Sequence, residues 1–146
     1  MKKVTILHMV LVAITVLAFA SIAAGGRPFT TTLSGAAEIP GPGDPDGSGT
    51  ATITLNQGQG EVCWEIHVTG ITLPATGAHI HFINPATGFG GVVVPLTPPD
   101  ESGHSMGCVS ADPDLIKSIR QNPEMYYVNV HNVDYPGGAL RGDLWK

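Results

Sequence analysis

Two segments of strictly alternating polar and apolar residues, separated by a short glycine turn, constrain the fold of this chain most strongly. In residues 50–56 and again in residues 61–69, every second side chain is apolar. This alternation is the period of a half-buried β-strand. The intervening Gln57-Gly58-Gln59-Gly60 turn is short enough for the two strands to form a hairpin.

Further β-forming segments follow one another along the chain, divided by loops rich in glycine and proline. We expect strands at residues 29–39, 78–83, 92–96, 104–111, 125–132 and 139–145. The period changes once, at residues 112–122, where Asp112 as the N-cap and Pro113 at the first position predict a short helix. Seven to eight short strands with one short helix predict an all-β fold, an antiparallel β-sandwich.

The first 24 residues differ in character from the rest. Lys2 and Lys3 precede an almost wholly apolar run that ends near Ala20, and small residues follow to Ala24. This is the layout of a secretory signal peptide, whereas the alternative, an uncleaved membrane anchor, usually has a longer apolar run. We therefore expect a signal peptide at residues 1–24 that is removed, one domain at residues 25–146, and a secreted, periplasmic or extracellular location.

The charge balance and the two cysteines restrict the partners and the compartment. The chain has 12 acidic and 7 basic residues, so it lacks the basic patch that nucleic acid requires. After Ala24 no segment is long and apolar enough to span a membrane. In an oxidising compartment the pair Cys63 and Cys108 favours a disulfide that closes a loop of about 45 residues, worth roughly 4 kcal/mol. The alternative is two buried free thiols.

The histidines are the candidate metal ligands. His79 and His81 are two residues apart, which on a strand places both rings on one face, roughly 7 Å apart. His131 occupies the corresponding face of the strand at residues 125–132. If these strands are neighbours, three imidazoles converge with a fourth position open, which suits copper, or zinc holding a water. The alternative is structural histidines hydrogen-bonded to the backbone, Asn129 or Asp134.

Other polar residues have two interpretations each. His104 is either an accessory fourth ligand or an exposed loop histidine. Glu38, Arg141 and Asp143 are charges within otherwise neutral segments, where a buried Glu38–Arg141 pair or a ligand-binding role would account for them. No nucleophile has a base placed beside it, so the sequence assigns no catalytic residue.

Five segments in register resemble the CHRD domain, the module named after the repeats of chordin. They are residues 33–40 (LSGAAEIP), 47–51 (GSGTA), 78–81 (AHIH), 127–132 (YVNVHN) and 135–144 (YPGGALRGDL). The resemblance covers residues 29–144 and implies a fold and an extracellular compartment more than a function. The growth-factor-binding modules of chordin are absent, so its antagonist role does not carry over.

Two short pieces, GAHIH (residues 77–81) and VNVH (residues 128–131), are similar to copper-ligand strands of copper/zinc superoxide dismutase. That similarity favours copper over zinc and puts Arg141 near the place of an anion-guiding arginine, but the zinc-ligand cluster of that enzyme is missing. We expect a binding protein that holds copper through His79, His81 and His131. The alternatives are a dismutase-like oxidoreductase and a metal-free module that binds an extracellular protein or surface partner.

Overall fold

The computed structural model describes residues 28–144, and the expected signal peptide lies outside the described residues. The described chain forms eight strands: β1 (Phe29–Ser34), β2 (Ser48–Asn56), β3 (Glu61–Thr69), β4 (Gly77–Phe82), β5 (Val92–Leu96), β6 (His104–Ser110), β7 (Tyr126–His131) and β8 (Leu140–Asp143). The helix α1 spans Pro113–Gln121, and single 3₁₀ turns occupy Gly35–Ala37 and Pro123–Met125.

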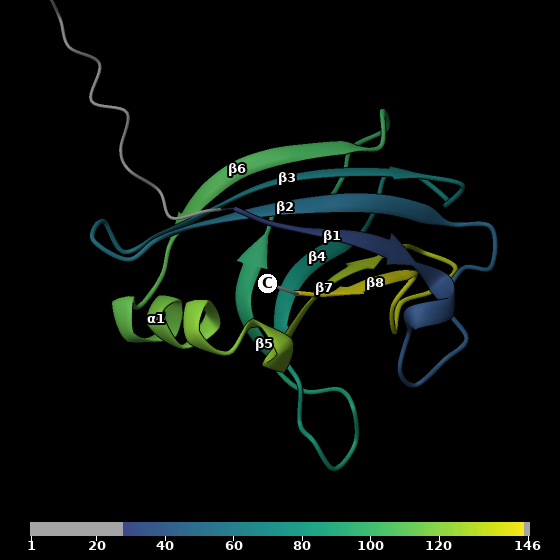
Figure 1. Cartoon of the computed structure of the whole chain (residues 1–146). Helices are drawn as coiled ribbons and strands as arrows, with labels where there is room; N and C mark the ends of the chain where they lie inside the picture. Colours follow the sequence, from purple (N-terminus) through teal and green to yellow (C-terminus); the bar gives the residue numbers. More distant parts are fainter. Residues whose placement is uncertain (1–27, 145–146) are drawn as a thin grey trace, which may run out of the picture.

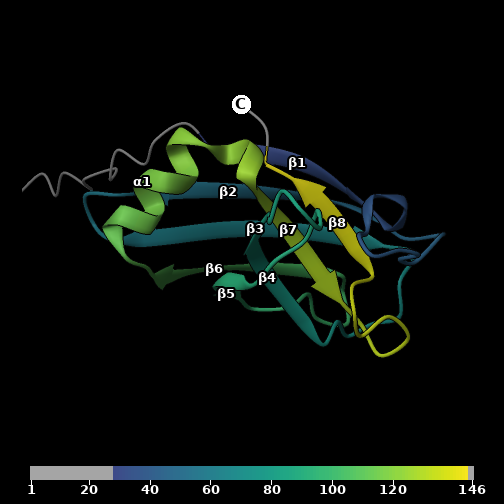
Figure 2. The same cartoon turned by 90° about the horizontal axis from the view of Figure 1, so that it is seen from below.

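All strand pairings are antiparallel and belong to one sheet, in the order β5-β4-β7-β8-β1-β2-β3-β6. The sheet folds over on itself, so that β1, β2, β3 and β6 lie across β4, β7 and β8 (Figure 1). From below, the strands of the two layers cross (Figure 2). The end strands β5 and β6 come into contact, which nearly closes the sheet. The predicted all-β sandwich with one short helix is confirmed.

The core lies between the two layers and is built from the alternate residues that the sequence pattern marked as apolar. Ile53 and Ile66 from one layer and Ile80 and Val128 from the other are completely buried. The helix α1 covers one end of the sandwich (Figure 1) with the buried side chains of Ile116 and Ile119. Burial of this apolar surface is the main term that stabilises the fold.

The boundaries of the helix follow from local chemistry that the sequence shows. Asp112 Oδ1 accepts a hydrogen bond from the Asp114 N–H at 2.7 Å, which satisfies one of the free amides of the first turn. Pro113 stands in the first turn, where a missing N–H costs nothing. The predicted helix and its N-cap are therefore confirmed.

The first strand is shorter than its sequence predicts. It ends at Ser34, and the chain turns into a 3₁₀ segment, whereas the threonine-rich pattern suggested a strand to Ile39. The cause is a tertiary contact: the Gly35 carbonyl accepts the N–H groups of Glu38 and Gly43, and a Cβ at Gly35 would lie 1.8 Å from the Asp44 carbonyl oxygen. The last strand likewise ends at Asp143 rather than Trp145, which is outside the described residues.

Cys63 and Cys108 form a disulfide between β3 and β6. The two residues are directly paired across the strands, with their Cα atoms 4.0 Å apart. The bond thus ties the end strand β6 to the rest of the sheet. Among the described residues, no helix is long and apolar enough to cross a membrane.

Removal of this disulfide should destabilise the domain without changing its fold. For the variant with Cys63→Ala and Cys108→Ala we expect the free energy of unfolding to fall by about 2–4 kcal/mol, because the unfolded chain regains the entropy of a 45-residue loop. Urea unfolding followed by tryptophan fluorescence measures this. The unfolding midpoint of wild-type protein in reductant should approach that of the variant. A variant with the same midpoint as oxidised wild type would contradict the prediction.

Candidate metal centre

The structure brings His79, His81 and His131 together. β4 and β7 are neighbours, and their register places Gly77 opposite His131 and His81 opposite Tyr127. One ring nitrogen from each histidine lies within 4.8 Å of the other two. The ring centroids are 5.1 Å apart for His79 and His131, and 5.5 Å apart for His79 and His81. The three rings thus surround a common point.

Backbone carbonyls select the ring nitrogen that each of two histidines presents to this point. Nδ1 of His81 lies 2.9 Å from the Gly90 carbonyl oxygen, and Nδ1 of His131 lies 3.1 Å from the Pro136 carbonyl oxygen. A carbonyl only accepts, so we assign the proton of each neutral ring to Nδ1. Each ring then turns the lone pair of Nε2 toward the other histidines; metal-binding imidazoles are commonly oriented by such a hydrogen bond from their other nitrogen.

Three buried nitrogens have no protein hydrogen-bond partner: His79 Nδ1, His81 Nε2 and His131 Nε2. Buried polar atoms are nearly always partnered, so these three nitrogens are candidates to hold a ligand. Nitrogens around a tetrahedral ion with bonds of about 2.0–2.1 Å lie roughly 3.4 Å apart. The observed spacing is within 4.8 Å, so small inward movements of the rings would let them fit an ion.

Small local features leave room for the rings. A Cβ at Gly77 would lie 3.2 Å from His79 Cε1 and 3.4 Å from His131 Cδ2, so a larger residue would crowd both. On the other side of β4, the pairing with β5 shifts its register between Ile80 and His81. Such irregularities re-aim side chains near functional sites.

The electrostatic surroundings keep the three imidazoles neutral. Burial lowers the pKa of His79, and His131 and His81 lower it further. Burial also lowers the pKa of His81, against the opposing effect of the Gly90 carbonyl, and the Arg141 guanidinium lowers it further. Burial likewise lowers the pKa of His131; the hydrogen bond to the Pro136 carbonyl opposes this shift, and His81 adds to it. Because only a neutral imidazole binds a metal, these shifts extend the binding-competent state to lower pH.

Arg141 lies behind the site. Its guanidinium carbon is 3.8 Å from the centroid of the Tyr127 ring, and that ring stacks on His81 at 4.8 Å. The Arg141 guanidinium also donates hydrogen bonds to Asp143 Oδ1 at 2.9 Å and to the Gly88 carbonyl oxygen at 2.8 Å. Arg141 is only 2% exposed. Its charge therefore lies inside the protein, against Tyr127, and not at the surface.

Comparison with known families adds one result. The CHRD domain matches residues 29–144, which is the whole of the described fold from β1 to the end of β8. The chain belongs to the CHRD domain family. No curated protein and no solved structure is significantly similar to this CHRD domain.

The predicted direct pair between Glu38 and Arg141 does not form in this CHRD domain. Both side chains are buried, but Glu38 Oε1 accepts a hydrogen bond from Asn129 Nδ2, and the carboxylate next to Arg141 is that of Asp143. Asn129 also donates to the Leu140 carbonyl at 2.9 Å. The amide of Asn129, which the sequence did not single out for this role, therefore links Glu38 to β7 and β8.

His104 lies apart from the three histidines. It is on β6, opposite His67 of β3, and the two rings stack with centroids 4.4 Å apart. His67 stands at an outward-facing position in the alternation of β3, and its side chain is exposed. The sequence did not indicate that His104 joins it, because their segments are far apart along the chain.

Sequence reasoning also missed the groups that orient the rings. The carbonyls of Gly90 and Pro136 lie in loops, and backbone carbonyls leave no trace in a sequence pattern. The turn Tyr135-Pro136-Gly137-Gly138 was visible as a family motif, and that motif was the available signal for the His131 contact.

Glu38 should make the stability of this CHRD domain fall as pH rises. Burial is the main cause that raises its pKa from 4.5 to about 7, against the opposing effects of Asn129 and Arg141. Between these values the folded chain holds a proton that the unfolded chain has lost, so the free energy of unfolding falls through this window, by on the order of 3 kcal/mol. Glu38→Gln cannot ionise and should lose this part of the pH dependence.

Urea unfolding of wild type and Glu38→Gln at several pH values between 4 and 8 measures the difference. The control is Glu101→Gln, which removes the same charge from an exposed loop position. Identical pH profiles for wild type and Glu38→Gln would contradict the prediction.

Proposed function

We propose that this CHRD domain is an exported metal-binding protein in which His79, His81 and His131 hold one copper ion. The observation that carries the proposal is the cluster of three histidines, each with a buried ring nitrogen that has no protein partner and with ligand atoms within 4.8 Å of one another. The disulfide between Cys63 and Cys108 is compatible with an oxidising, extracellular or periplasmic location.

A purely structural role for these histidines leaves the cluster unexplained. His81 and His131 each use only Nδ1 for a hydrogen bond. Each buried ring nitrogen left without a partner would lower the free energy of unfolding by about 1–3 kcal/mol. Protonation does not resolve this, because the pKa of every ring is lowered and three cations at this spacing would repel one another. A metal ion accepts all three lone pairs at once.

Copper is the metal that this donor set favours. Imidazole nitrogen binds both copper and zinc, and divalent copper binds a given nitrogen site more tightly than zinc. Three imidazoles leave a further coordination position open in either case. Zinc holding a water is the alternative, and competition between the two ions decides it.

Copper titration followed by electron paramagnetic resonance tests the proposal. We expect a tight copper site whose spectrum shows three nitrogen ligands. His131→Ala should weaken this site by tenfold or more and lose one nitrogen from the spectrum, since it removes a ligand. Gly77→Ala should weaken it through crowding of His79 and His131 while every donor remains.

The matched control is Val133→Ala, an exposed residue two positions beyond His131, which should bind copper as wild type does. Circular dichroism checks that each variant is folded. Copper binding by His131→Ala that is as tight as wild type, with the same spectrum, would reject this residue as a ligand. A wild-type chain with no three-nitrogen copper or zinc site would reject the proposal and leave the metal-free interaction module.

A dismutase-like reaction is the enzymatic alternative, in which copper alternates between two oxidation states. The burial of Arg141 argues against it, because an arginine that guides an anion must reach solvent. Superoxide decay in the presence of the copper-loaded protein, compared with free copper at equal concentration, tests the reaction. A large excess rate for the protein would favour the enzyme over simple binding.

A further inference from the structure

A second cluster of potential metal ligands lies on the outer face of the β3–β6 pair: Glu65, His67 and His104. His67 and His104 are directly paired across the two antiparallel strands, and Glu65 precedes His67 by two residues. Residues two apart on a strand share a face, so the three side chains project to the same side. One ligand atom from each lies within 4.8 Å of the other two.

The distances place one carboxylate oxygen between two ring nitrogens. Glu65 Oε1 is 3.1 Å from His67 Nε2 and 3.8 Å from His104 Nε2. His104 Nε2 is itself buried and has no hydrogen-bond partner. The 3.1 Å contact is a hydrogen bond and the 3.8 Å contact is too long for one, whereas a metal ion can bind both nitrogens and the oxygen together.

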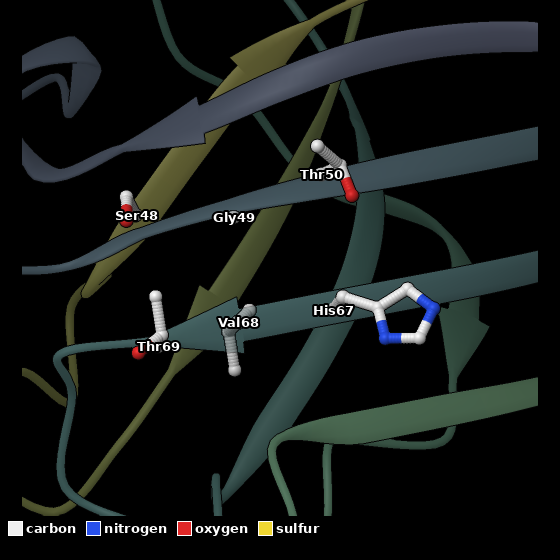
Figure 3. A pocket seen from close by; sticks show the side chains of 6 residues that line it. All are labelled: Ser48, Gly49, Thr50, His67, Val68 and Thr69. Carbon is white, nitrogen blue, oxygen red and sulfur yellow. The ribbon is translucent and has the colours of Figure 1, made fainter.

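The base of the cluster is rigid and its outer side is open. The disulfide between Cys63 and Cys108 joins the same two strands. Cys63 is two residues before Glu65 on β3, so the disulfide lies on the same face of the sheet as the cluster. The side chains of His67 and Glu65 are 58% and 56% exposed. An open hollow beside His67 is lined by residues 48–50 of β2 and 67–69 of β3 (Figure 3).

We propose that Glu65, His67 and His104 form a second, solvent-accessible site for a divalent transition-metal ion such as Cu²⁺ or Zn²⁺. Two imidazoles and one carboxylate are a donor set for both ions, and solvent can complete the coordination. Its ligands come from β3 and β6, whereas those of the first cluster come from β4 and β7. This inference therefore stands independently of the proposed copper site.

The competing explanation is a surface ion pair between Glu65 and a protonated histidine. The stacked rings, with centroids 4.4 Å apart, hold both histidines beside the one carboxylate, where a metal ion could use all three side chains. The exposed positions also make an ion pair worth little to stability. The ion pair and the metal site are distinguished by whether the cluster binds metal.

The test counts the ions bound by the purified protein, with Cu²⁺ alone as the probe and electron paramagnetic resonance as the readout. Wild type should bind about two ions, one with three nitrogen ligands and a second, weaker one with about two. The variant with His67→Asn and His104→Asn should bind about one and retain the three-nitrogen spectrum. Glu65→Gln should weaken the second site at least severalfold, since it removes the anionic ligand.

Thr50→Ala is the matched control, because Thr50 is an exposed β2 residue paired with His67 and should leave both sites intact. The proposal is overturned if the double histidine variant binds as many ions as wild type. If only the site of His79, His81 and His131 did not bind copper, the result would differ: wild type would bind about one ion and the double variant none. Circular dichroism checks that each variant remains folded.

Discussion

The antiparallel pairing of β4 with β7 is the contact on which the candidate site depends. Its register buries Ile80 and Val128 in the core and turns His79, His81 and His131 to the other face. A slip by one residue would exchange the two faces and bury the histidines among apolar side chains. Burial of the valine and isoleucine side chains therefore holds the three donors in place, and core packing and the site are determined by the same register.

The outer face of β7 is itself covered, and this separates the site from an ordinary polar surface. Tyr127 and Asn129 are nearly fully buried there, although they alternate with the core valines. Loops supply the cover: one contributes Glu38 to Asn129, and others contribute the carbonyls that bind His81 and His131. Removal from water makes an unpartnered ring nitrogen costly, and that cost favours a bound ion.

The two histidine clusters use the same strand periodicity in different surroundings. At β4 and β7 the rings are enclosed, oriented by carbonyls and held neutral. At β3 and β6 the rings of His67 and His104 lie at the surface beside a carboxylate, on strands joined by a disulfide. The enclosed cluster offers three nitrogens, and the surface cluster offers two nitrogens with one oxygen.

The sequence by itself determined the elements whose cause is local. Alternation marked the hairpin of β2 and β3, Asp112 and Pro113 marked α1, and the spacing of His79 and His81 placed both on one face. Only the tertiary structure decided which distant residues meet: Asn129 rather than Arg141 binds Glu38, and His104 joins His67. The reason is physical, since strand order and loop paths are set by the packing of the whole core, which no single segment encodes.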